Sequence, residues 1–139
     1  MNTLAAPFNL AEFEATLPPA PQALASYVTA VQTGNLLYTC GVLPMQNGHV
    51  MYTGAAGNFD RSLEDVQAAT RLCLINALSI VKNALGSLQS DAQIIRLTGY
   101  IKSMPKRNIM KVLKSLLKRL RDGIIFVEMI DNSILTYWR

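Results

Sequence analysis

The sequence TGNLLYTCGVLP occupies residues 33–44 and predicts the first structural element of the chain. Its β-forming residues 36–40 follow a Gly-Asn break, and a second β-forming run, residues 27–31, precedes the break. Two such runs around a Gly-Asn pair predict a β-hairpin. Gly41 and Pro44 are expected to end the second strand.

The hairpin is followed by two further signals. Asn47-Gly48 is a strong turn dipeptide, and residues 49–52 are expected to form a third strand after it. A long helix is then predicted to begin after Ser62, whose hydroxyl can accept a hydrogen bond from the free amide of Asp65. Gly86 is expected to end this helix of about six turns in the left-handed conformation. The helix is amphipathic because one apolar stripe recurs at spacings of three and four: Val66, Ala69, Cys73, Ala77, Ile80, Val81 and Ala84.

The remaining chain alternates strand and helix patterns. Residues 94–101 predict a strand with a bulge at Gly99, and Asn108 is expected to cap a second helix that ends at Asp122-Gly123. Residues 124–127 predict a short buried strand, and residues 134–138 a further strand. Strands interleaved with two helices indicate an α+β fold with both helices on one face of the sheet. No linker or repeat is visible, so residues 1–139 are expected to form a single domain.

Composition limits the class of protein. With 139 residues, 50% of them hydrophobic, the chain can bury one core of its own, which excludes a disordered tail, a collagen-like repeat and a disulfide-stapled miniprotein. No apolar run approaches the ~20 residues of a membrane span. Residues 1–17, taken as an N-terminal extension, lack the features of a targeting peptide, and Cys40 and Cys73 stand alone. We therefore expect a cytoplasmic protein without membrane contact.

The charge is divided unevenly. Residues 1–101 carry four basic and six acidic residues, a net charge of −2, whereas residues 102–139 carry nine and three, a net charge of +6. The basic segment could bind RNA or an acidic membrane surface. The alternative, to which we give more weight, is the solvated face of an amphipathic helix. His49 is the only histidine of the chain, and no cluster of metal ligands accompanies it.

An ordered series of motifs resembles the Rid (reactive intermediate deaminase) family, also called YjgF. The motifs are Pro19-Ala20-Pro21, Ser26-Tyr27-Val28, residues 33–44, Asn47-Gly48, Tyr52-Thr53-Gly54, residues 68–78 and residues 95–101. The resemblance covers residues 15–103. It implies a chorismate-mutase-like α+β fold and a homotrimer with small-molecule pockets between subunits. Family enzymes hydrolyse reactive enamines and imines, such as 2-aminoacrylate, to a ketoacid and ammonia without a cofactor or a metal.

The resemblance also implies site residues. Tyr27, Cys40 and Gly41 match substrate-binding positions of the family. A carboxylate substrate needs a cation, ideally a bidentate arginine; Arg121 is the nearest candidate for the arginine of the family and Glu128 for its late glutamate. These two are the predicted catalytic residues. For Tyr27, Cys40, Gly41 and Arg121 a structural role is the alternative, such as a solvated charge for Arg121 or a buried small side chain for Cys40.

The atypical basic segment, residues 104–139, departs from the family pattern because the string ARxAV around the family's arginine is missing. Divergence, a shortened C-terminus and a change of reading frame after about Ser103 would each produce this departure. Three functions therefore stay open. The first is an enamine/imine deaminase, the second a non-catalytic trimer that binds a small ligand, and the third, with least support, an RNA-associating protein of the endoribonuclease or translation-inhibitor type.

Overall fold

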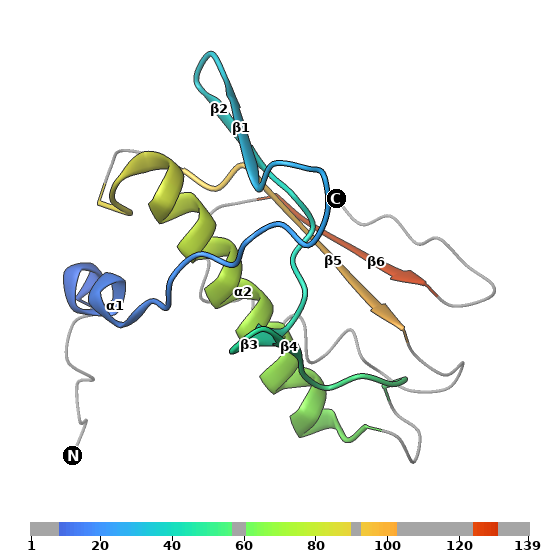
Figure 1. The fold of residues 1–139 in the computed structure, drawn as a ribbon. Coiled ribbons are helices and arrows are strands. Elements are labelled where there is room, and N and C mark those ends of the chain that lie inside the picture. Colours follow the sequence, from blue (N-terminus) through green and yellow to red (C-terminus); the bar gives the residue numbers. More distant parts are fainter. Residues whose placement is uncertain (1–8, 57–60, 90–92, 103–123, 131–139) are drawn as a thin grey trace, which may run out of the picture. The chain divides into compact units, whose positions relative to one another are not determined.

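The computed structural model describes residues 9–56, 61–89 and 93–102, together with the backbone of residues 124–130. Within these ranges the chain forms an α+β arrangement (Figure 1), which confirms the predicted fold class. Its elements are α1 (Leu10–Thr16), β1 (Ala30–Thr33), β2 (Leu36–Thr39), β3 (Met45–Gln46), β4 (His49–Val50), α2 (Leu63–Leu85), β5 (Arg96–Lys102) and β6 (Ile124–Ile130).

The chain divides into two compact units. The first consists of Met1–Val42 and Ile75–Ala92, and the second of Leu43–Leu74 and Gln93–Arg139. The first unit contains α1, the β1–β2 hairpin and the C-terminal half of α2, and the second contains the other strands and the N-terminal half of α2. The single domain over residues 1–139 stays a prediction.

The predicted first hairpin is confirmed. β1 and β2 are antiparallel, with Thr33 opposite Leu36 and Ala30 opposite Thr39. Gly34 has a φ of 54°, which suits the first position of the two-residue turns that join twisted strands. The predicted start of β1 at Tyr27 is wrong, because residues 24–27 form a bend stabilised by their own hydrogen bonds.

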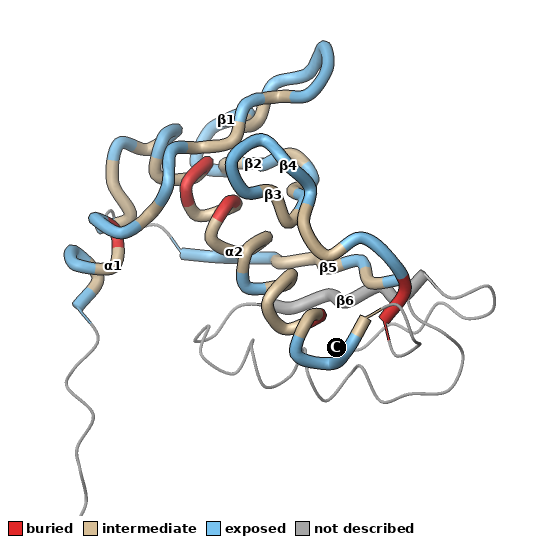
Figure 2. The backbone as a smooth tube through the Cα atoms, turned by 60° about the horizontal axis from the view of Figure 1, so that its bottom comes forward, coloured by how far each residue is buried: buried red, intermediate tan, exposed pale blue. Residues whose placement is uncertain are grey.

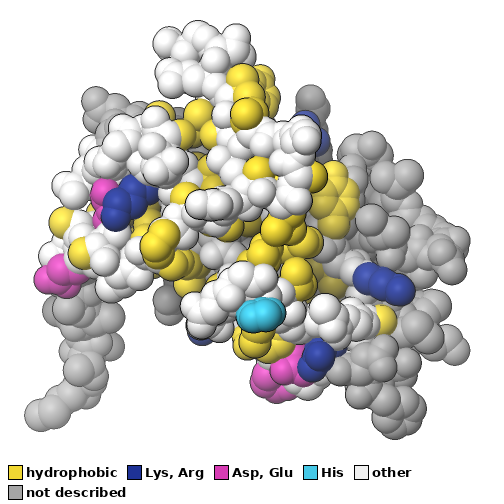
Figure 3. Space-filling model, viewed as in Figure 1, with side chains coloured by type: hydrophobic (Ala, Val, Ile, Leu, Met, Phe, Trp, Pro, Cys, Tyr) yellow, Lys and Arg dark blue, Asp and Glu magenta, His cyan; other side chains and the backbone are white. Residues whose placement is uncertain are grey.

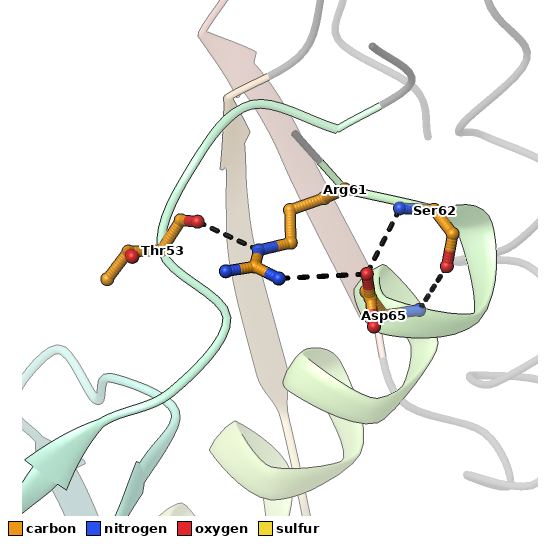
Figure 4. Close-up of polar contacts among 4 residues, drawn as sticks. All are labelled: Thr53, Arg61, Ser62 and Asp65. Atoms are coloured by element: carbon orange, nitrogen blue, oxygen red, sulfur yellow. Dashed lines mark hydrogen bonds and ion pairs between the residues drawn. The ribbon is translucent and has the colours of Figure 1, made fainter. Parts of the chain in front are cut away.

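The long helix is also confirmed, and a reciprocal cap explains where it begins (Figure 4). The Asp65 amide donates to Ser62 Oγ at 3.1 Å, and the Ser62 amide donates to Asp65 Oδ2 at 3.2 Å. Arg61 lies beside this cap: its Nε donates to the Thr53 carbonyl at 2.8 Å, and its Nη1 lies 3.9 Å from Asp65 Oδ2. Gly86, with a φ of 82°, ends the helix as predicted, and its amide donates to the Lys82 carbonyl.

We expect Ser62→Ala to lower the free energy of unfolding by about 1 kcal/mol, because the Asp65 amide at the first turn of α2 loses its acceptor. The urea midpoint measured by circular dichroism checks this. Ser26→Ala, at an exposed bend outside the helices, is the matched control and should change the midpoint little. An equal loss in both variants would contradict a specific role of the cap.

The second unit holds a tight hairpin and a parallel strand pair. Asn47 and Gly48, with φ values of 51° and 80°, connect β3 to β4, as expected of an Asn-Gly turn.

β5 and β6 pair in parallel in an unbroken register from Arg96 opposite Ile124 to Lys102 opposite Ile130. The predicted bulge at Gly99 is therefore wrong, since Gly99 pairs regularly with Val127. The predicted second helix and the strand at residues 134–138 lie outside the described residues.

Buried positions concentrate on α2 (Figure 2). In the first unit they are Asn76, Ser79 and Ile80 of α2, together with Glu14 of α1. In the second unit Val66 is buried, as are Ala55 and Ala56 in the loop before the helix, where the Ala56 amide donates to the Lys102 carbonyl at 2.9 Å. The helix thus supplies buried side chains to each unit.

Candidate functional site

The open end of the β1–β2 hairpin carries the three predicted substrate-binding residues. Beyond the paired strands, the Cys40 amide donates to the Thr29 carbonyl at 2.8 Å. Gly41 directly follows Cys40, and Tyr27 precedes Thr29 by two residues. One hydrogen bond therefore joins the two segments that hold Tyr27, Cys40 and Gly41.

Gly41 leaves open space at this end of the hairpin. A Cβ atom built on Gly41 would meet no atom within 4 Å apart from those of its chain neighbours, and its backbone is not in the left-handed region. Neither a close contact nor an unusual φ requires glycine here. Open space beside an exposed backbone is what a ligand needs in order to approach the chain.

Tyr27 lies at the same end with an exposed fraction of 44%. Its hydroxyl oxygen accepts a hydrogen bond from the Leu24 amide at 3.2 Å, and its own amide donates to the Ala25 carbonyl at 2.8 Å. Because the oxygen serves as the acceptor, its O–H hydrogen can be donated to a carboxylate or to water.

A buried carboxylate that sequence reasoning missed lies in the same unit. Glu14 of α1 is only 8% exposed, and its Oε2 accepts from Ser87 Oγ at 3.0 Å and from the Leu88 amide at 3.1 Å. Lys82 Nζ donates to the Glu14 carbonyl at 3.0 Å. Asn9, which caps α1 by accepting from the Ala11 and Glu12 amides, was the available signal for this helix.

The structure does not show the two predicted catalytic residues together with the three predicted substrate-binding residues. Arg121 lies outside the described residues. Glu128 lies on β6, where the register places it opposite Tyr100 of β5. Tyr27, Cys40 and Gly41 belong to the first unit, and Glu128 to the second.

The two cysteines are free and both are half-buried. Burial raises the pKa of the Cys73 thiol from its ordinary 9.0 to about 11. A raised pKa disfavours the nucleophilic thiolate form, which is consistent with a packing role for Cys73. The substrate-binding role of Cys40 stays a prediction.

The residues that the structure describes contain neither a cluster of metal ligands nor a helix that could span a membrane. No three His, Cys, Asp or Glu side chains gather there in a way that could hold a metal ion. None of the helices described there is both long enough and apolar enough to cross a bilayer. His49 on β4 is exposed at the surface (Figure 3).

The β1–β2 hairpin also has an apolar face that the sequence did not single out. Val31 and Tyr38 pair across the strands and are 53% and 58% exposed, and Leu36, two residues before Tyr38, is exposed on the same face. Apolar side chains are visible at the surface over this hairpin (Figure 3). The consecutive apolar run Leu36-Leu37-Tyr38 was the available signal, since successive side chains of a strand point to opposite faces and cannot all pack beneath it.

Comparisons with known proteins agree with this fold. The family model described as Endoribonuclease L-PSP matches residues 18–124, a range that includes Arg121 but ends before Glu128. Protein TCP17 of Trypanosoma cruzi is 30% identical over 97 residues, which make up 70% of this chain and 60% of that protein. The chain thus spans about 60% of the length of this curated relative.

Two solved structures are similar in fold. A protein of Shewanella oneidensis MR-1, provisionally named an endoribonuclease, has a TM-score of 0.67 and 26% identity over 81% of this chain and 80% of its own. Protein Atu1372 of Agrobacterium tumefaciens, of unknown function, has a TM-score of 0.67 and 32% identity over 87% of this chain and 79% of its own. These likenesses confirm the YjgF-like, chorismate-mutase-like fold. The chain therefore belongs to the Endoribonuclease L-PSP family, which is also the YjgF or Rid family.

Proposed function

We propose that this chain is an enamine/imine deaminase that hydrolyses small amino-acid-derived intermediates in the cytoplasm. The observation that carries the proposal is the end of the β1–β2 hairpin, where the Thr29–Cys40 hydrogen bond joins the segments of Tyr27 and Gly41. The phenol supplies a donor and Gly41 supplies open backbone, and both match positions that bind substrate in the family the chain resembles.

The reaction needs no covalent nucleophile. 2-Aminoacrylate takes a proton at its methylene carbon and loses one proton from its nitrogen, which converts it into 2-iminopropanoate. One water then adds to the carbon of the C=N bond. The C–N bond breaks, which leaves pyruvate and ammonia. The protein has to bind the carboxylate, orient the C=N bond and position the water. A donor from Tyr27 and a cation from Arg121 are suited to these tasks.

The same proposal includes a homotrimer. The apolar face formed by Val31, Leu36 and Tyr38 is exposed in the single chain, and such faces are typical of subunit contacts. Light scattering of the purified protein tests the assembly, and a monodisperse monomer would contradict the proposed pocket between subunits.

We expect Gly41→Val to raise the KM for 2-aminoacrylate by roughly 30-fold or more, because the added methyl groups occupy the space left for the substrate. The assay generates 2-aminoacrylate with a dehydratase and follows ketoacid release with and without this protein. No acceleration by the wild-type protein above the rate in solvent would refute the deaminase proposal.

The thermal stability of Gly41→Val shows whether a raised KM comes from a blocked substrate site or from a misfolded protein. Gly41 has no positive φ and no neighbour within 4 Å of a built Cβ, so the thermal midpoint of Gly41→Val is expected to stay close to that of the wild type. Gly99→Ala on β5, also at a site with open space and without positive φ, is the control and should retain its KM. An unchanged KM in Gly41→Val would remove Gly41 from the substrate site.

RNA association is the second candidate. The names of the family model and of the Shewanella protein refer to endoribonucleases. One face of β5 places Arg96, the 62% exposed Tyr100 and Lys102 at alternating positions, a mixture of basic and aromatic residues that suits single-stranded nucleic acid. RNA binding that weakens steeply with salt, in a protein without deaminase activity, would favour this candidate.

A further inference from the structure

We propose that Glu14 is a positioning residue for the substrate site: by holding α1 against the segment that follows α2, it fixes the chain that carries Tyr27. This inference rests on the proposed substrate contact of Tyr27. It concerns an element that begins before residue 18, where the match to the family model starts.

α1 needs an attachment in order to form. A helix of seven residues has too few internal hydrogen bonds to be stable alone in water. Asn9 satisfies amides at its N-terminus, and Lys82 Nζ satisfies the Glu14 carbonyl near its C-terminus. The helix is therefore stabilised by the end of α2, a contact that spans 68 residues of sequence.

The Glu14 carboxylate forms the buried part of this attachment. Its two hydrogen bonds go to Ser87 Oγ and to the Leu88 amide, both directly after the Gly86 stop of α2. Ser87 Oγ in turn accepts from the Gln89 amide at 3.0 Å. A buried carboxylate that loses these donors, or donors that lose the carboxylate, would leave polar groups without partners.

A short, stiff connection links this attachment to Tyr27. Leu17 ends α1 with its amide donating to the Glu14 carbonyl at 3.3 Å, and three of the next four residues are prolines with fixed φ. Leu24, three residues after the last of them, donates its amide to the Tyr27 hydroxyl. All of these residues belong to the first unit, so the position of α1 determines where the Tyr27 segment starts.

The test compares Glu14→Ala with Glu14→Gln, which keeps an acceptor oxygen, and with Glu12→Ala at an exposed carboxylate of the same helix. We expect Glu14→Ala to raise the KM for 2-aminoacrylate by roughly five- to tenfold with kcat within about twofold, since it displaces a binding group and not a reacting one. Hydrogen exchange of residues 22–29 should become faster. Glu14→Gln and Glu12→Ala should resemble the wild type in both measurements.

The outcomes separate this proposal from the deaminase proposal. Exchange of residues 22–29 and a KM that both stay at wild-type values in Glu14→Ala would overturn it. A lower thermal midpoint with an unchanged KM would also overturn it, because Glu14 would then act on stability alone. If the wild-type protein is not a deaminase, hydrogen exchange of residues 22–29 is the deciding measurement. Faster exchange in Glu14→Ala supports the positioning of Tyr27, and unchanged exchange refutes it.

Discussion

Arg121→Ala is expected to lower kcat/KM for 2-aminoacrylate by about 10²- to 10³-fold, because a carboxylate substrate would lose two charge-assisted hydrogen bonds at once. Arg121 falls within the range matched by the family model and precedes β6 by three residues. We propose it as the counterpart of the arginine that the family uses. Steady-state ketoacid release from 2-aminoacrylate measures the effect.

Two neighbouring substitutions show whether the effect is local. Arg119→Ala removes the same charge two residues earlier in the same basic segment and should change kcat/KM little if Arg121 itself contacts the substrate. Arg121→Lys keeps the charge but not the paired donors, so it should recover only part of the activity. A wild-type rate in Arg121→Ala would remove the residue from the site. Equal losses in both alanine variants would assign the effect to the charge of the segment.

The features predicted correctly are those that depend on neighbours in the sequence. The Ser62 cap requires only Asp65 three residues away, and the Gly86 stop and the Asn47-Gly48 turn require only their own φ values. The β1–β2 hairpin follows from a two-residue turn between β-forming runs. Local propensity decides such features, so the sequence carries them directly.

The features that were missed depend on contacts between distant residues or on a competing local bond. Residues 27–28 have β-forming side chains, yet the bond from the Leu24 amide to the Tyr27 hydroxyl favours a bend. Glu14 has the appearance of a surface acid, and only its contacts with Ser87 and Leu88 reveal it as buried. Gly99 suggested a bulge, but pairing with Val127 keeps it in the regular ladder.

The sequence predicted only the part of the candidate site that lies next to the β1–β2 hairpin. Tyr27, Cys40 and Gly41 were chosen by resemblance, and the β1–β2 register places their two segments together. Arg121 and Glu128 belong to the basic part of the chain, beyond the last motif recognised in the sequence, although the family model extends to residue 124 and so includes Arg121. The charge difference between residues 1–101 and 102–139 therefore coincides with the division between the predicted binding residues and the predicted catalytic ones.

Ile80→Ala is expected to lower the free energy of unfolding by about 3 kcal/mol. Ile80 is 2% exposed and is the largest fully buried side chain among the described residues, so its truncation leaves a cavity and removes apolar contacts. Proteins of this size are typically stable by only about 5–15 kcal/mol, so the loss should shift the thermal midpoint by several degrees. Urea denaturation at one fixed protein concentration measures it, because assembly would make stability depend on concentration.

Two control variants distinguish the effect of burying Ile80 from the effect of the total apolar content of α2. Ile80→Val removes one methylene group and should cost about 1 kcal/mol. Leu63→Ala removes as many carbon atoms as Ile80→Ala, but at a 47% exposed position of the same helix, and should cost less than about 1 kcal/mol. If Leu63→Ala were as harmful as Ile80→Ala, stability would follow the apolar content of α2 and not the burial of Ile80. The graded order from Leu63→Ala through Ile80→Val to Ile80→Ala is the result that burial requires, since only at Ile80 does the lost volume become a cavity.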